Sequence, residues 1–392
     1  MILKRIRLFA VAALLCAGAI LRADTLPATA PMETLQDKLY SVFENNRDAI
    51  VKVYAQKSLP AVDKDGKEIE QLTLDVGSGF LIGKDGIVMT SAYVTHSANK
   101  LWVEWRGVLL DAKSVGLDPL TTVSILKIEG DFKSKNAPVV NMDSSSDLPR
   151  VATILMALSY EMGLPPSPRV GLATAHNIEF GGNFLPTVYV RTSIPAPRGS
   201  TGGAVFDLNG KFAGMTIASL PEIGGSFILP AKAAARIRDD ILLCGEPVYS
   251  WFGLQAEDTD GINSTKVVVR MVAENAPAKK AGFMVGDEIL AVNSKKISNN
   301  TQLRNITFFV RPGETAEFKI KRGNSVLKLD VLAERMAPDI IRAAEKIYRH
   351  RMQTSEMDKF RQINPNRLPS QKRKTPQKTI ELLPNIFDKR KS

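Results

Sequence analysis

Short apolar stretches separated by turn residues dominate the chain from about residue 47 to residue 230. Stretches of this kind, bounded by Gly, Asp, Asn or Pro, are typical of β-strands joined by turns. The strands expected are Ala49–Tyr54, Gly79–Ile82, Ile87–Thr90, Leu101–Trp105, Ser124–Ile128, Thr153–Ala157, Thr187–Arg191 and Lys211–Ile217. Their number and spacing predict a β-barrel or sandwich, and apolar residues at helical spacing over 231–243 predict a helix that closes the unit.

A second unit of mixed strand and helix is expected from residue 246 to residue 335. The strands expected are Lys266–Val272, Glu288–Val292, Ala316–Arg322 and Val326–Leu332, and the helices are Ala276–Ala281 and Thr301–Phe309. A segment of about 90 residues is the size of one small α+β domain.

Both ends of the chain differ from this folded middle. Lys4, Arg5 and Arg7 precede an apolar run from Leu8 to Leu21, which predicts an export signal over residues 1–23. The alternative is an uncleaved N-terminal membrane anchor; either way the protein is expected to be exported, in the periplasm. Residues 336–392 predict a basic tail, first helical along an apolar stripe at 340–348 and then disordered. The expected boundaries are therefore 1–23, 24–245, 246–335 and 336–392.

The net charge of +11 carries little information about function. The excess of Lys and Arg lies in residues 1–23 and 336–392, so the folded middle is nearly neutral and no nucleic-acid partner is expected. For the basic tail two interpretations stay open, contact with anionic lipid and a solubilising segment. Apart from Cys16 in the predicted signal, Cys244 is the only cysteine, which predicts no intramolecular disulfide and a small buried side chain.

Gly199-Ser200-Thr201-Gly202-Gly203 is the first segment that suggests chemistry. Glycines around a hydroxyl residue permit an unusual backbone in which successive N–H groups point at a developing oxyanion. Gly199, Ser200 and Thr201 are therefore the candidate oxyanion loop. Glycine-rich turns before strands are common, so the segment alone is a weak signal. No His/Cys cluster for a metal, no P-loop and no dinucleotide fingerprint accompanies it, so neither a metal nor a cofactor is predicted.

Other motifs occur before and after this segment along the chain. The first part of the chain carries Val76-Gly77-Ser78-Gly79-Phe80-Leu81-Ile82, Asp85-Gly86-Ile87-Val88-Met89-Thr90 and Gly116-Leu117-Asp118-Pro119-Leu120-Thr121. The second unit carries Trp251-Phe252-Gly253-Leu254, Asn275-Ala276-Pro277-Ala278 and Ala281-Gly282-Phe283-Met284-Val285-Gly286-Asp287. Together they resemble the HtrA/Deg family of exported proteases. The resemblance implies a mainly β fold, a trypsin-like double β-barrel followed by a small α+β PDZ domain, and a trimer.

The resemblance also indicates where a catalytic triad would lie. The family's histidine, aspartate and serine match Tyr93, Thr122 and Thr201, so none of the three is kept. A triad needs a base near neutral pH and a carboxylate to orient it, whereas a phenol has a pKa near 10 and threonine carries no charge. The sequence therefore predicts a pseudoprotease. A rewired enzyme that pairs Ser200 with His96 is the alternative; His176 and His350 are interpreted as structural and solvated.

The PDZ-like unit keeps its expected binding residues. Trp251, Phe252, Gly253 and Leu254 match the loop whose backbone N–H groups capture a C-terminal carboxylate, and the strand after it offers an edge to an extended peptide. The alternative is that Trp251 and Phe252 only pack against the seam between domains. The function expected is binding of C-terminal peptides or misfolded envelope proteins. A working serine endopeptidase and an envelope scaffold held by the basic tail are the other hypotheses.

Overall fold

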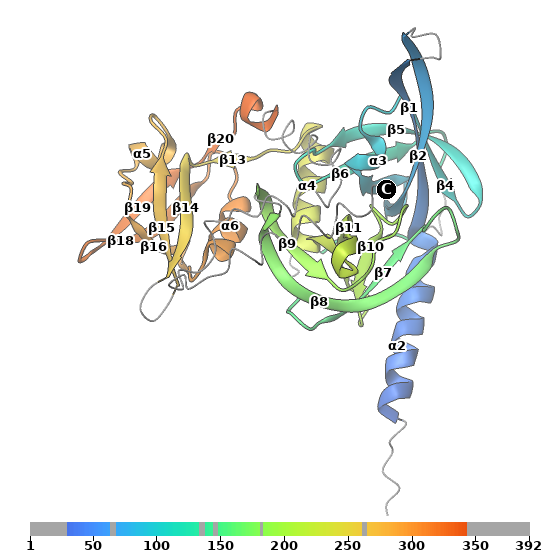
Figure 1. Cartoon of the computed structure of the whole chain (residues 1–392), viewed down its shortest axis with the longest axis horizontal. Helices are drawn as coiled ribbons and strands as arrows, with labels where there is room; N and C mark the ends of the chain where they lie inside the picture. Colours follow the sequence, from blue (N-terminus) through green and yellow to red (C-terminus); the bar gives the residue numbers. More distant parts are fainter. Residues whose placement is uncertain are drawn as a thin grey trace, which may run out of the picture.

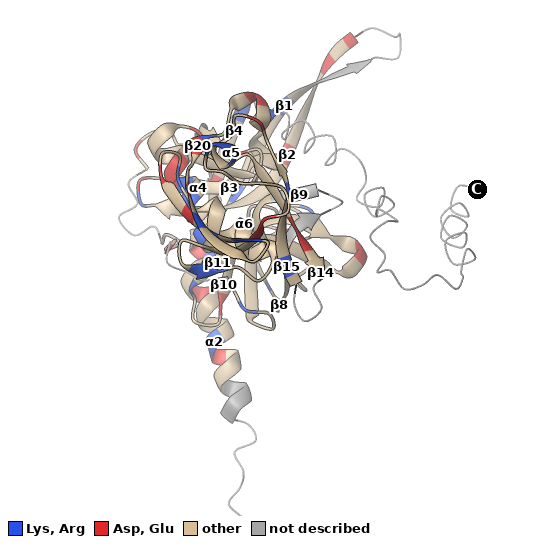
Figure 2. Cartoon of the chain, turned by 90° about the vertical axis from the view of Figure 1, so that its left-hand side faces the viewer, with Lys and Arg blue, Asp and Glu red and all other residues tan. Residues whose placement is uncertain are grey.

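The structure, a computed structural model, describes residues 30–62, 68–132, 138–143, 148–180, 183–260 and 265–342. The predicted export signal and most of the predicted tail lie outside these residues. Lys and Arg positions (blue) alternate with Asp and Glu positions (red) along the ribbon of these residues (Figure 2), which agrees with a nearly neutral folded middle.

Two closed six-stranded β-barrels form the larger part of the molecule (Figure 1). The first barrel has the order β1-β2-β3-β6-β5-β4. Its strands are β1 (Ile50–Val62), β2 (Glu68–Gly83), β3 (Ile87–Ser91), β4 (Lys100–Trp105), β5 (Val108–Leu117) and β6 (Val123–Ile128). The second barrel has the order β10-β11-β12-β9-β8-β7. Its strands are β7 (Ile154–Ser159), β8 (Ser167–Phe180), β9 (Asn183–Thr192), β10 (Ala204–Asp207), β11 (Phe212–Leu220) and β12 (Gly225–Pro230).

One apolar core joins the two barrels. Phe80 of the first barrel lies 5.2 Å from Phe212 of the second, measured between ring centroids, and both rings are buried. Short helical elements lie around the barrels: α2 (Ala30–Asn46), η1 (Arg47–Ala49), α3 (Ala92–Thr95), η2 (Pro221–Ile223) and α4 (Ala231–Cys244). Helix α2 projects away from the barrels and inserts Val42 into this core (Figure 1). Helix α4 packs its alanines and Ile237 there, so the two barrels and α4 are held by the same buried surface.

The second unit is an antiparallel sheet with two helices, α5 and α6. Its main sheet has the order β14-β15-β16-β18-β19, and a two-stranded ribbon pairs β13 with β20. The elements are β13 (Ser250–Trp251), β14 (Leu254–Asp260), β15 (Thr265–Val272), α5 (Pro277–Lys280), β16 (Glu288–Val292), β17 (Lys295–Lys296), α6 (Asn300–Phe308), β18 (Thr315–Arg322), β19 (Ser325–Leu332) and β20 (Glu334–Arg335). Its own core contains Phe283 and Phe318. The fold class expected from the sequence, mainly β with two trypsin-like barrels and a PDZ-like α+β unit, is confirmed.

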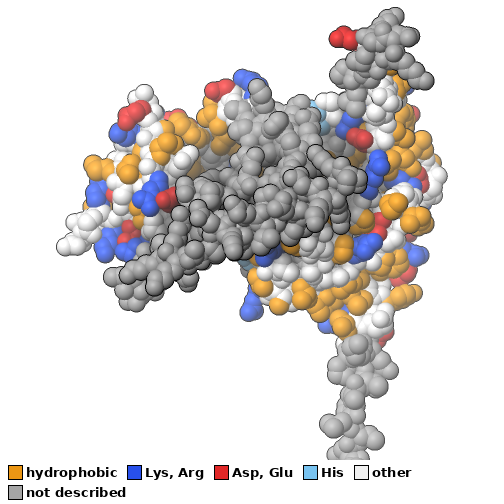
Figure 3. Space-filling model, viewed as in Figure 1, with side chains coloured by type: hydrophobic (Ala, Val, Ile, Leu, Met, Phe, Trp, Pro, Cys, Tyr) orange, Lys and Arg blue, Asp and Glu red, His pale blue; other side chains and the backbone are white. Residues whose placement is uncertain are grey.

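Several elements differ from the sequence-based expectation. Among the barrel strands, β5, β8, β10 and β12 were not in the expected list, and helix α2 was not expected either. Strands β1 and β2 continue into a long hairpin (Figure 1). Exposed apolar side chains include Leu72 on β2 and Val170 on β8. Hydrophobic side chains (orange) are scattered over the visible face of the molecule (Figure 3).

The prediction that Cys244 is buried is wrong. Cys244 is the last residue of α4 and is exposed, together with Leu242 and Leu243. The helix turns its final residues away from the barrels, and Gly245 ends it in the left-handed conformation at φ 76°.

Candidate functional site

Three segments from different parts of the sequence meet between the barrels: α3, the turn before β6, and the loop before β10. The Ala92 N–H donates to the Thr122 carbonyl at 2.7 Å, and the Ser78 N–H donates to the Thr201 carbonyl at 3.1 Å. A Cβ atom on Gly202 would lie 2.2 Å from the Ser78 carbonyl oxygen, and Gly202 has φ +89°. Only glycine fits there, so the loop that carries Thr201 can approach the first barrel closely.

Tyr93 lies on α3 with its main chain held on both sides. Its N–H donates to the Ser91 hydroxyl at 3.3 Å, which caps the short helix. Its carbonyl accepts from the Lys57 ammonium at 3.0 Å, and Lys57 is also paired with Asp75 at 2.7 Å. Side chains of the first barrel therefore fix the backbone at position 93, where the side chain is a phenol.

Thr122 has a backbone that β-branched residues rarely adopt. Its φ is +65°, in the left-handed region, which costs roughly 1–2 kcal/mol for an L-residue with a Cβ. Its hydroxyl is buried and makes no hydrogen bond to any described residue. The backbone at position 122 is therefore strained, and the side chain there carries no charge.

The turn just before Thr122 is organised by one buried carboxylate. Asp118 accepts hydrogen bonds from the Leu120 N–H at 3.0 Å, the Thr121 N–H at 3.3 Å and the Thr121 hydroxyl. It also accepts from the hydroxyl of Tyr249, a residue of the segment that leads into the second unit. Burial raises the pKa of Asp118, and burial together with the nearby carboxylate raises the pKa of Tyr249 well above its ordinary value.

The glycine loop keeps donors that an incoming oxygen can use. The Arg198 carbonyl accepts from the Met162 N–H at 2.8 Å, and the Gly199 carbonyl accepts from the Ser78 hydroxyl at 2.7 Å. Within the described part of the chain, neither the Gly199 nor the Thr201 N–H donates to a backbone carbonyl. Because no described backbone carbonyl uses them, these two N–H groups are the ones that could stabilise an oxyanion.

The Ser200–His96 hydrogen bond that the alternative enzyme would need is not formed. The Ser200 hydroxyl is buried and, among the described residues, has no hydrogen-bond partner. The His96 ring contacts the Ser97 hydroxyl through Nδ1 at 2.6 Å. His176 lies on β8, where its Nε2 is 2.8 Å from the Pro149 carbonyl oxygen, and His350 lies outside the described residues.

The loop at the start of β14 presents main-chain donors. The Phe252 carbonyl accepts from the Ala278 N–H at 2.9 Å, and the Gly253 carbonyl accepts from the Ala273 N–H at 2.8 Å. Both carbonyls therefore point into the unit, and no described backbone carbonyl accepts from the Phe252 or Gly253 N–H. Gly253 has φ +72°, and a Cβ there would lie 2.1 Å from that of Ala276, so glycine is required.

The aromatic residues of this loop make their contacts inside the second unit. The Phe252 ring lies 5.8 Å from that of Phe318, edge to face, at the margin of the core. Trp251 pairs with Glu334 in the two-stranded ribbon. Leu254 begins β14 and is half-buried against the same core as Phe252. All of these contacts are with residues of the second unit.

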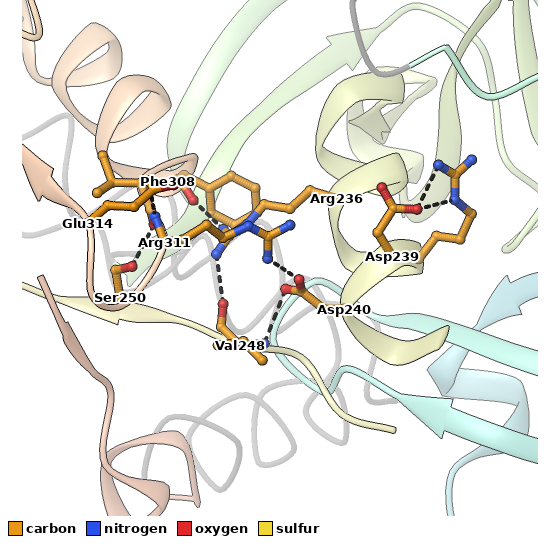
Figure 4. Close-up of polar contacts among 10 residues, drawn as sticks. Arg236, Asp239, Asp240, Val248, Ser250, Phe308, Arg311 and Glu314 are labelled. Atoms are coloured by element: carbon orange, nitrogen blue, oxygen red, sulfur yellow. Dashed lines mark hydrogen bonds and ion pairs between the residues drawn. The ribbon is translucent and has the colours of Figure 1, made fainter. Parts of the chain in front are cut away.

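A separate set of contacts, here called the inter-domain clamp, consists of Arg236 and Asp240 on α4 and Phe308 and Arg311 of the second unit. Arg236 donates to the Phe308 carbonyl, and also to the Val248 carbonyl at 2.7 Å (Figure 4). Asp240 is ion-paired with Arg311 and accepts from the Val248 N–H at 3.1 Å. Arg236 and Asp240 are almost fully buried, and burial lowers the pKa of Arg236. Because buried charges that lose a partner are costly, the clamp fixes the end of α6 against α4.

Three of these contributions were not foreseen from the sequence. Ser78 joins the two barrels at the glycine loop. Tyr249 joins the segment that leads into the second unit to the turn before Thr122, and Arg236 joins α4 to α6. Ser78 and Asp118 lie within motifs that the sequence made visible, but nothing local marks their partners. Among the described residues, no three His, Cys, Asp or Glu side chains gather as a metal site, and no helix is long and apolar enough to cross a membrane.

Comparisons with known proteins agree with this architecture. Residues 77–215 match the trypsin-like peptidase domain family, and residues 250–332 match the PDZ domain family. The chain is 28% identical over 292 residues to a probable periplasmic serine endoprotease, DegP-like, of Ectopseudomonas mendocina. The matched region covers 71% of this chain and 60% of the relative. The chain is 29% identical over 274 residues to the protein of the same description from Bartonella henselae, covering 66% and 54%. The chain thus spans little more than half the length of these relatives.

Solved structures show the same fold. The HtrA-type protease AlgW with a decapeptide has a TM-score of 0.60 and 22% identity, covering 76% of this chain and 99% of that one. The serine endoprotease from Yersinia pestis has a TM-score of 0.53 and 22% identity, covering 76% and 98%.

Proposed function

With a trypsin-like peptidase domain followed by a PDZ domain, the chain is HtrA/DegP-like, and from this premise we propose that it is an exported pseudoprotease that binds peptides or unfolded chains. Its partners would be C-terminal peptides or misfolded envelope proteins, held by the PDZ domain and the degenerate cleft. Export and a periplasmic location are proposed from the predicted signal and from the periplasmic relatives. Assembly as a trimer, and contact of the tail with anionic lipid, belong to the same proposal.

The chemistry at three positions carries this proposal. The Ala92 N–H, next to Tyr93, donates to the Thr122 carbonyl, and the Thr201 carbonyl accepts from the Ser78 N–H. None of the side chains at positions 93, 122 and 201 supplies a base or a carboxylate. Loss of triad members lowers kcat by about 10⁴–10⁶ and leaves only binding and oxyanion stabilisation. The buried Ser200 hydroxyl argues in the same direction, because a nucleophile must reach the substrate.

An assay on unfolded casein tests the absence of proteolysis. The purified chain is expected to give no turnover above that of Ser200→Ala or Thr201→Ala variants. Turnover that either substitution abolishes would favour the active endopeptidase and overturn the proposal.

A titration with C-terminal peptides tests the binding half of the proposal. Free-acid peptides should bind more tightly than C-terminally amidated ones by about 1.5–3 kcal/mol, because a charged acceptor at the Phe252 and Gly253 N–H groups is lost. Gly253→Val should lower stability as well as binding, since its Cβ would clash with that of buried Ala276 at a positive φ, so the comparison of the two peptide forms with the wild type is the measurement that decides. Equal affinities for the two peptide forms would refute carboxylate capture.

A further inference from the structure

The last turn of α4 carries three apolar residues that no described segment covers. Leu243 is 85% exposed, Leu242 is 45% exposed, and Cys244 is exposed as well. The helix stays regular to its end, because the Gly245 N–H donates to the Ile241 carbonyl at 2.9 Å. Single exposed apolar residues are ordinary, but three in succession at the end of a packed helix indicate a contact surface.

Two of these three residues lie on the side of α4 that faces the second unit. Asp240 points toward that unit, where it is paired with Arg311 (Figure 4). Residues three and four positions further along an α-helix lie on the same side, so Leu243 and Cys244 continue the Asp240 side by one turn. Leu242 is two positions further, roughly 200° around the helix axis, and therefore faces away from the second unit.

The chain returns to this end of α4 as it leaves the second unit. Arg335 is ion-paired with Glu246 at 2.6 Å, and the Met336 N–H donates to the Tyr249 carbonyl at 2.8 Å. Glu246 follows Cys244 by only two residues. The segment that follows β20 therefore starts close to the exposed turn.

A helix begins in this segment and already packs against the barrels. Residues 338–342 are helical, and the N–H groups of Ile340 and Ile341 donate to the Ala337 carbonyl at 3.1 and 3.3 Å. Ile341 packs against the core that joins the barrels, to which Ile241 of α4 also belongs, while Ile340 is 37% exposed. The described residues end one position later, with one apolar residue of this helix packed and its neighbour still exposed.

The sequence that follows continues the apolar face of this helix. Ala344, Ile347 and Tyr348 come after Ile340 and Ile341 at intervals of three, four and seven residues, which places all five on one side of a helix. At a rise of about 1.5 Å per residue, the helix from 341 to 348 would extend about 10 Å, the diameter of another helix with its side chains. This length is sufficient to cross the end of α4.

We propose that residues 343–348 continue this helix and dock their apolar face on the last turn of α4, where they cover Leu243 and Cys244 but not Leu242. The start of the tail then adds apolar contacts to the inter-domain clamp, at the junction of the peptidase and PDZ domains. A second copy of the chain is the less suitable occupant. Three side chains offer far less than the roughly 800 Å² that each partner contributes to a standard protein interface.

The reactivity of Cys244 tests this contact, because a covered thiol reacts slowly with a reagent in solution. All chains carry Cys16→Ser, so that Cys244 is the only thiol. The rate of reaction with an uncharged maleimide is compared between the full chain and a chain that ends at Arg342, each relative to its own rate in urea. The full chain should react at least roughly tenfold more slowly, a protection that corresponds to a docking free energy of about 1.4 kcal/mol. A chain that ends at Asn364 should react like the full chain.

Two substitutions to glutamine form a matched pair within the full chain. Ile347→Gln changes the proposed docking face, whereas Lys346→Gln changes the opposite side of the same helical turn. In I347Q the rate should rise toward that of the chain ending at Arg342, and in K346Q it should stay at that of the full chain.

Three results would overturn the inference. Equal rates in the full chain and the chain ending at Arg342 would show that the tail leaves Cys244 uncovered. Equal rates in I347Q and K346Q would show that the apolar face does not make the contact. Protection that is lost on dilution would identify a second copy of the chain as the occupant. The glutamine pair keeps the full length, so that comparison stands even if the shortened chain does not fold.

Discussion

The hydroxyl of Tyr249 donates a hydrogen bond to the carboxylate of Asp118, which lies in the turn leading to Thr122. Both side chains are buried, and 131 residues separate them in the sequence. The segment that enters the PDZ domain is therefore bonded to the turn before β6 of the first barrel. The position of the PDZ domain and the shape of that turn are linked through one hydroxyl.

Replacement of Tyr249 by Phe is expected to lower the free energy of unfolding by about 1–3 kcal/mol, because the Asp118 carboxylate loses a buried donor. Urea denaturation measures the change. Tyr54→Phe is the matched control, since it removes a hydroxyl that donates to Glu104 at 2.7 Å, far from the linker in sequence. Hydrogen exchange of residues 118–122 should quicken in Y249F and stay unchanged in Y54F; equal protection in both variants would contradict the linkage.

The stability of the protein should depend on pH through Asp118. Because burial raises its pKa, folding favours the protonated carboxyl, and that contribution is complete below the ordinary pKa of 3.8. The contribution is lost as pH rises through the raised pKa of the folded state. The difference in unfolding free energy between the wild type and Asp118→Asn should therefore be largest in acid and shrink toward neutral pH. A difference that grows with pH would show that the hydrogen bonds outweigh burial at this carboxylate.

Removal of the Ser78 hydroxyl should loosen the glycine loop. The hydroxyl donates to the Gly199 carbonyl at 2.7 Å and accepts from the Tyr160 N–H at 2.8 Å, so Ser78→Ala leaves two main-chain groups unpaired. The expected loss is about 1–3 kcal/mol in the free energy of unfolding. Ser226→Ala, which removes a buried hydroxyl 2.8 Å from that of Thr192, is the control. Both variants should be less stable, but faster exchange over residues 198–203 is expected in S78A alone.

Restoration of the triad tests whether only the side-chain chemistry is missing. Tyr93→His, Thr122→Asp and Thr201→Ser together should produce measurable cleavage of casein, while each single change should do little because triad members act as a unit. Aspartate also tolerates the positive φ at position 122 better than threonine does. The control is the same variant with Thr201→Ala. A folded triple variant without activity would mean that the cleft itself differs from that of an active protease.

Periodicity and turn residues were sufficient to predict most strands, both helices of the PDZ domain and the closing helix α4. They failed for α2, where apolar residues are sparse and helix formation depends on packing of Val42 against a core built from other segments. They also failed for Cys244, because no described segment covers the last turn of α4. The candidate positions came from motifs around Gly77, Asp118 and Gly202. The hydrogen bonds of Ser78 and Tyr249 could not be predicted, because each joins residues far apart in the sequence.

The buried linker has a practical consequence for dissecting the molecule. No lysine or arginine lies between Arg238 and Lys266, so trypsin has no cleavage point between the peptidase domain and the PDZ domain. The aromatic residues that chymotrypsin would need are Tyr249, which is buried, and Trp251 and Phe252, which are half-buried. Limited digestion of the native chain with trypsin should therefore leave the two domains joined.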